Sequence, residues 1–152
     1  LVWPAWAQAL AVFVGCYGFS ILFNIHGKWM VLCVIGGTAT WMIYLLCEEL
    51  GLDVYTVNLY ATIFAALYSE VMARVRRCPV TPYLVIAIFP LLPGAGVYYT
   101  MSLGLQGEML EALRKGLETA GIAGSLAVGI LLVSTVFRLL TAFLARRERK
   151  QT

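Results

Sequence analysis

The sequence predicts an all-α membrane protein with five transmembrane helices, and two features of its composition carry that prediction. Hydrophobic residues make up 61% of the 152 residues, and Asp, Glu, Lys and Arg together make up 12%, whereas soluble domains are about 45–50% apolar and ~25% charged. The apolar residues also gather into runs of about twenty, the length that crosses a bilayer. This excludes a soluble enzyme and a disordered segment, and a net charge of +3 is too dilute for a nucleic-acid-binding module.

We expect residues 1–152 to form a single transmembrane domain, in which the first two spans are residues 3–23 and 29–47. The first span has Gln8 as its most polar member and no basic segment before it. It is therefore interpreted as a membrane span and not as a cleaved signal peptide. The second span is rich in small residues around Gly36 and Gly37, which suit close helix contact or a polar path.

The third and fourth spans are expected at residues 54–75 and 82–103. The third has the weakest signal, because Asn58 and Glu70 lower its apolar character. The fourth is strongly apolar, but two prolines and two glycines interrupt it near its midpoint. Such residues break or kink a helix, so this span is predicted to be discontinuous.

The fifth span is expected at residues 118–144 and contains Arg138. Before it, residues 106–118 place leucine or methionine every fourth residue among charged side chains. This pattern predicts an amphipathic helix between spans four and five, lying at the outer interface or packing on a partner. An ordinary connecting helix is the alternative.

The distribution of cations sets the orientation of the five spans. Eight of the eleven Lys and Arg residues would share one side of the membrane: Lys28, Arg74, Arg76, Arg77, Arg146, Arg147, Arg149 and Lys150. Cytoplasmic loops carry an excess of Lys and Arg. The pattern therefore places the N-terminus outside and the C-terminus in the cytoplasm, whereas four or six spans would scatter the cations.

The interruption in the fourth span is the main candidate for a functional site. It comprises Pro90, Pro93, Gly94 and Gly96, and the hydroxyl of Tyr98 follows it. Backbone groups left unpaired at mid-bilayer must face protein or a water-filled cavity, and secondary transporters hold substrates at such discontinuous helices. The alternative is a kinked helix whose freed groups are satisfied by its neighbours.

Polar groups within the other spans are the next candidates, since each is costly in hydrocarbon. Asn58 lies one turn into its span, where an interfacial position is as plausible as a functional one. Glu70 and Arg74 are four residues apart and can pair on one helix face; a proton-relay role is the alternative to a structural ion pair. Arg138 is expected to snorkel to the cytoplasmic interface, or to bind a substrate carboxylate.

A stripe of small residues at Gly121, Ser125 and Gly129 predicts close helix contact, within the chain or between chains of a higher oligomer. No metal site and no cofactor are expected, since the four cysteines lack CxxC spacing and His26 is the only histidine. Nucleophile and hydrolase motifs are also lacking, so we expect no enzyme activity.

Three elements together resemble the threonine/serine exporter family: Gly18 to Asn24, the basic loop after span three, and Pro90-Leu91-Leu92-Pro93-Gly94 followed by Tyr98. The resemblance runs from about residue 15 to 137 and is closest to the small subunit of the family's two-component bacterial form. It implies a multi-pass protein of the bacterial cytoplasmic (inner) membrane that exports small hydrophilic metabolites, either threonine/serine-type amino acids or small dicarboxylates.

The resemblance also implies a larger partner subunit with about five further spans, inserted in the opposite orientation. The family pattern covers Phe23, Asn24, Pro90, Pro93, Gly94 and, less securely, Tyr98, without assigning a role to any of them. We expect Asn24 and Asn58 to belong to the substrate path together with the break. The sequence therefore predicts one half of a secondary exporter in a lipid bilayer. The rival interpretation is a non-transporting membrane scaffold or assembly subunit, for which the broken helix is only a docking kink.

Overall fold

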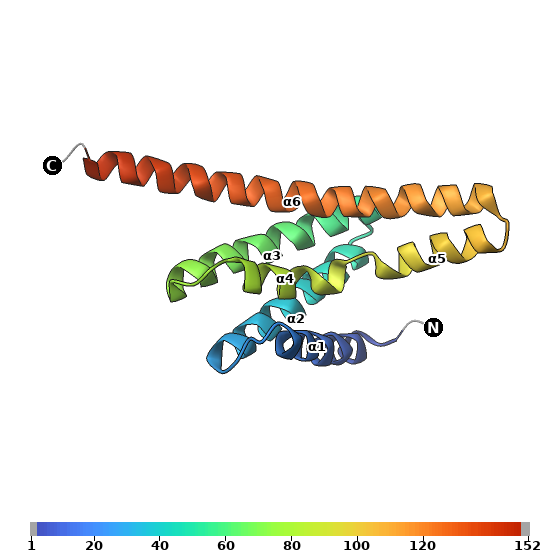
Figure 1. Cartoon of the computed structure of the whole chain (residues 1–152), viewed down its shortest axis with the longest axis horizontal. Helices are drawn as coiled ribbons and strands as arrows, with labels where there is room; N and C mark the ends of the chain where they lie inside the picture. The colour runs from blue at the N-terminus through green and yellow to red at the C-terminus, as the bar shows by residue number, and fades with distance from the viewer. Residues whose placement is uncertain (1–2, 150–152) are drawn as a thin grey trace.

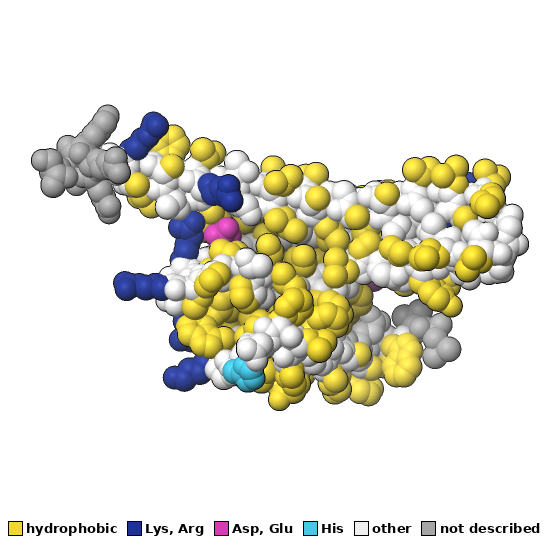
Figure 2. All heavy atoms as spheres, in the orientation of Figure 1, with side chains coloured by type: hydrophobic (Ala, Val, Ile, Leu, Met, Phe, Trp, Pro, Cys, Tyr) yellow, Lys and Arg dark blue, Asp and Glu magenta, His cyan; other side chains and the backbone are white. Residues whose placement is uncertain are grey.

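The computed structural model describes residues 3–149, and within this range the regular secondary structure consists of helices alone. Six α-helices and one 3₁₀ helix follow one another, so the all-α prediction is confirmed. Successive segments run back and forth along the molecule: α1 starts near one end, and α6 finishes at the opposite end (Figure 1). Apolar side chains cover much of the face shown in Figure 2, and many large hydrophobic residues are exposed, as expected for a protein surrounded by lipid.

The first three helices have bounds that local backbone and capping interactions explain at the end of α1 and at the start of α3. Helix α1 covers Ala5–Leu22 and is followed by Asn24, which has a positive φ of 57°. Helix α2 covers Lys28–Glu49. Helix α3 covers Val54–Arg76; the Asp53 carboxylate accepts a hydrogen bond from the Tyr55 backbone N–H at 3.3 Å and so caps its first turn.

The fourth predicted span is broken, as expected, but over a shorter stretch. Helix α4 covers Thr81–Ile88, the 3₁₀ helix η1 covers Phe89–Leu91, and α5 covers Gly94–Leu105. The two parts meet at an angle of 51°. The expectation that the break extends to Gly96 is wrong, because α5 already begins at Gly94: Pro93, as its N-cap residue, needs no N–H to start a new helix.

The separate amphipathic helix expected between spans four and five is also not observed. Helix α6 runs uninterrupted over Met109–Arg149 and includes both that segment and the predicted fifth span. The turn before it uses Gly107, with a φ of 83°, and no proline follows to break the helix. Its 41 residues extend about 60 Å at ~1.5 Å per residue, about twice the hydrocarbon thickness.

Three helices are long and apolar enough to cross a membrane, namely α1, α2 and α6, and the bent pair α4–α5 raises the number to four. Helix α3 has 23 residues but falls outside this set, because its tyrosines, Asn58 and Glu70 lower its hydropathy. It lies between α2, α4 and α6. Its buried residues include Asn58, Thr62 and Ser69, each of which bonds to a carbonyl one turn earlier.

A cluster of buried apolar residues lies where α1, α2 and α4 meet. Its buried side chains are Cys16, Cys33, Val34, Tyr83 and Ile86. Gly37 makes this contact possible, since a Cβ atom there would lie 2.5 Å from Cys16 Sγ and 3.0 Å from the carbonyl oxygen of Ile86. The small residues that the sequence placed in the second span therefore serve close helix packing.

Candidate functional site

The break between α4 and α5 is held by contacts to α1 and α2. Phe89 lies against Phe19 of α1, with ring centroids 3.7 Å apart. In a continuous helix the carbonyl oxygen of Ile86 would accept the N–H of residue 90, which Pro90 lacks. That oxygen instead accepts a hydrogen bond from Cys16 Sγ at 3.8 Å. Part of the backbone freed by the break is thus satisfied inside the chain.

The far side of the break is more open. The N–H of Gly94 donates to the carbonyl of Leu92 at 2.8 Å, and a Cβ atom on Gly94 would meet nothing within 4 Å. Pro93 lines a recess of about 350 Å³ between α5 and α6. Gly96 makes close contact with Thr119 of α6, so its role in the structure is helix packing.

The other residues predicted for the substrate path lie apart from this recess. Tyr98 projects from α5 and is 67% exposed. Asn24 lies at the end of α1 and lines a separate cavity of about 260 Å³ near Trp29 and Cys78. Asn58 is buried within α3, and its side-chain amide donates to the carbonyl of Val54 at 2.8 Å.

Among the predicted charged residues, Glu70 and Arg74 lie in the last two turns of α3. Glu70 and Arg74 form an ion pair at 3.7 Å. Arg74 also donates to the carbonyl of Phe137 at 3.4 Å, and its guanidinium lies 4.8 Å from the Phe137 ring centroid. These contacts join α3 to α6, whereas Arg138 is exposed.

The small-residue stripe on α6 faces α3. Gly121 lies against the ring of Tyr55, and a Cβ atom on Gly129 would lie 3.0 Å from Thr62 Cβ. Ser125 donates to the carbonyl of Gly121 at 3.1 Å and so stays within its own helix. The two glycines therefore let α3 and α6 approach each other closely, in a parallel arrangement.

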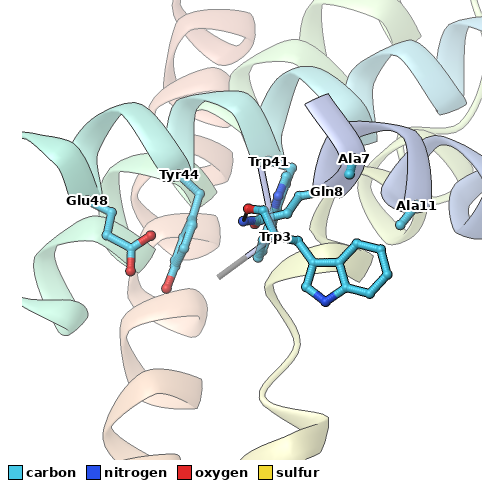
Figure 3. A pocket seen from close by; sticks show the side chains of 7 residues that line it. All are labelled: Trp3, Ala7, Gln8, Ala11, Trp41, Tyr44 and Glu48. Atoms are coloured by element: carbon cyan, nitrogen blue, oxygen red, sulfur yellow. Dashed lines mark hydrogen bonds between the residues drawn. The ribbon is translucent and has the colours of Figure 1, made fainter. Parts of the chain in front are cut away.

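Sequence reasoning missed a larger pocket, of about 600 Å³, between α1 and α2 (Figure 3). Its lining residues come from the segment just before α1, from the first half of α1 and from the second half of α2: Trp3, Ala7, Gln8, Ala11, Trp41, Tyr44 and Glu48. The α2 side of the pocket could have been found from the sequence, because the spacing of positions 41, 44 and 48 places them on one helix face. The pocket itself depends on how α1 packs against that face, which no spacing in α2 reveals.

No group of three or more His, Cys, Asp or Glu side chains able to hold a metal ion occurs within residues 3–149.

Comparison with known proteins identifies the family of this chain. A family model described as "Threonine/Serine exporter, ThrE" matches residues 8–136. The chain belongs to the threonine/serine exporter family. No curated protein and no solved structure matches it. The family assignment and the apolar helices together make it a membrane transporter of the exporter type.

Proposed function

We propose that this exporter-family chain is the small subunit of a secondary exporter in the bacterial cytoplasmic membrane. It works with a larger five-span subunit and moves threonine/serine-type amino acids or small dicarboxylates out of the cell. The observation that carries the proposal is the broken α4–α5 span in a chain of this family. Discontinuous helices of this kind form substrate sites in many secondary transporters.

The proposed topology has five crossings, with the N-terminus outside and the C-terminus in the cytoplasm. Helices α1, α2, α3, the α4–α5 pair and α6 run in alternating directions (Figure 1). Lys28 opens α2, while Arg74 and Arg76 lie in the last turn of α3, so these cations share one end of the molecule. Lys and Arg favour the cytoplasmic side. Helix α3 is about 34 Å long at ~1.5 Å per residue, which is enough to cross.

Within this topology, the start of α5 holds a charged end of the substrate. The N-terminus of a helix carries unpaired N–H groups and a partial positive charge, which favour a carboxylate. Gly94 leaves open space there, and both proposed substrate classes carry a carboxylate. The larger subunit would close the site from the opposite side, in the manner of paired transporter halves.

The test replaces Pro93 and Gly94 with Leu and Ala, which favours a continuous helix. Efflux of labelled threonine, serine or succinate should be measured in cells or proteoliposomes that hold both subunits. It should fall at least about tenfold, because the loss of a contact that positions the substrate lowers the transport rate by that much or more. Gly104→Ala is the matched control: it lies in the same helix, with open space around its Cα. Unchanged efflux by P93L/G94A, with normal membrane levels, would contradict this assignment.

One observation favours the alternative, a non-transporting scaffold subunit. The Ile86 carbonyl freed by Pro90 is already satisfied by Cys16, so the break needs no ligand for stability. Reconstitution of the larger subunit with and without this chain separates the two functions. A transport subunit is required for flux itself, whereas a scaffold changes only the amount of assembled partner.

A further inference from the structure

The cavity of about 260 Å³ that Asn24 lines lies where the α1–α2 turn meets the loop between α3 and α4. Most of its lining is apolar. Trp29 of α2 contributes to one wall, and Cys78, Pro79 and Pro82 contribute to another. None of the described residues that line it is acidic. The cavity therefore suits the hydrocarbon part of a ligand and does not repel an anion.

Two cationic residues lie next to Trp29. The guanidinium carbon of Arg76 is 5.6 Å from the centroid of the Trp29 ring, a cation–π contact that holds the arginine beside the cavity. The carbonyl oxygen of Arg76 accepts a hydrogen bond from Cys78 Sγ at 3.2 Å, so the end of α3 is tied to the cavity wall. Lys28 precedes Trp29 at the start of α2 and is exposed.

The positive charge beside the cavity has no acidic partner in the described part of the chain. Glu70 pairs with Arg74, and neither Lys28 nor Arg76 forms an ion pair among residues 3–149. Figure 2 shows Lys and Arg side chains along this end of the molecule, with His26 beside them. We call it the basic end, and it carries Lys28, Arg74, Arg76, Arg77, Arg146 and Arg147. Cations without acidic partners attract an anion.

The start of α2 adds partial positive charge at the same place. Its N-cap residue is Gly27, which makes no side-chain hydrogen bond to the helix, and its first turn contains no acidic residue. The first N–H groups of a helix have no partner within the helix and favour negative charge. They supplement the two cationic side chains.

We propose that this site binds an anionic phospholipid. The phosphate lies at Lys28, Arg76 and the start of α2, and part of an acyl chain fills the cavity. A lipid fits better than a free phosphate ion, because the cations border an apolar cavity that an inorganic ion would leave empty. Basic groups beside membrane helices bind anionic lipid headgroups in this way. The inference goes beyond the proposed exporter function and does not depend on it, since it concerns lipid binding and not transport.

The experiment measures lipid binding to the purified full-length chain in a neutral detergent by native mass spectrometry. The probes are phosphatidylglycerol and phosphatidylcholine with the same acyl chains, and inorganic phosphate serves as a competitor. The variants are Lys28→Gln and Arg76→Gln. Both residues are exposed, so the substitutions leave the buried core intact. Arg147→Gln is the matched control, because Arg147 is an exposed cation of α6, which lines no part of the cavity.

Phosphatidylglycerol should bind the unaltered chain and R147Q alike, and phosphatidylcholine should bind at least about tenfold more weakly. The affinity for phosphatidylglycerol should fall about fivefold in K28Q and in R76Q, the usual effect of one cation near an anionic lipid. Equal losses in R76Q and R147Q would show that the basic end attracts lipid only through its diffuse charge, and would overturn the inference. Equal affinity for the two lipids, or displacement of phosphatidylglycerol by inorganic phosphate, would overturn it as well.

Discussion

At the scale of single residues, the junction beside the break between α4 and α5 depends on one glycine in another helix, α2. Gly37 of α2 lies against Cys16 and against the Ile86 carbonyl, the group freed by Pro90. A side chain at position 37 would push α1 or α4 away, and the bend is anchored at this junction. The sequence predicted close contact at this glycine, but its partners come from two distant helices.

We predict that Gly37→Ala destabilises the protein, although alanine is the better helix former. The added Cβ would lie 3.0 Å from a backbone oxygen, and overpacking of this kind costs about 1–3 kcal/mol. Gly18→Ala is the control, because a Cβ there meets nothing within 4 Å and the change should stabilise α1 by up to ~1 kcal/mol. Unfolding in detergent, followed by circular dichroism, gives the comparison. A melting temperature of G37A equal to or above that of G18A would show that the junction is looser than described.

At the scale of elements, the difference between expectation and structure lies in α6. Hydrophobic spacing predicted helix on both sides of residue 118, and both stretches are helical. What spacing could not show is whether the two helices join. They do, because no proline separates them and because α5 covers the first part of α6 through the Gly96–Thr119 and Gly116–Thr100 contacts.

The parallel pairing of α3 and α6 predicts a specific cross-link. With the native cysteines replaced by alanine, Thr62→Cys and Gly129→Cys should form a disulfide under mild oxidation, since the two Cβ positions lie 3.0 Å apart. The control pair Thr62→Cys and Gly124→Cys should stay reduced, because position 124 has open space around it. Mobility on non-reducing gels, after protease cleavage between the helices, reports the link. Equal linking of both pairs would mean that the register of α3 against α6 is different.

At the scale of the whole molecule, the cations and the alternating helix directions agree. Both features place the α1–α2 and α3–α4 loops with the end of α6 at the basic end (Figures 1 and 2). The α5–α6 turn lies at the other end. Charge bias in the sequence already predicted this grouping, and the path of the backbone reproduces it in space.

This arrangement predicts opposite accessibility for two single cysteines introduced into the cysteine-free chain. Gln106→Cys, in the α5–α6 turn, should react with a membrane-impermeant maleimide added to intact cells. His26→Cys, in the α1–α2 turn, should react only after the cells are opened, because the Lys and Arg residues beside it favour the cytoplasm. Both positions are exposed. Labelling of both from the same side would rule out five crossings.

The sequence by itself determined that lipid surrounds the chain, that the chain is helical, that one span is broken, and to which family the chain belongs. Composition, the length of apolar runs and a Pro-x-x-Pro-Gly motif can all be read from neighbouring residues in the chain. Only the tertiary structure decided where the break ends, that α6 is continuous, and that aromatic residues of α2 and alanines of α1 enclose a pocket. Those outcomes depend on which helix faces meet. That choice follows from contacts between residues far apart in the chain, such as Cys16 and Ile86, and not from spacing within any one helix.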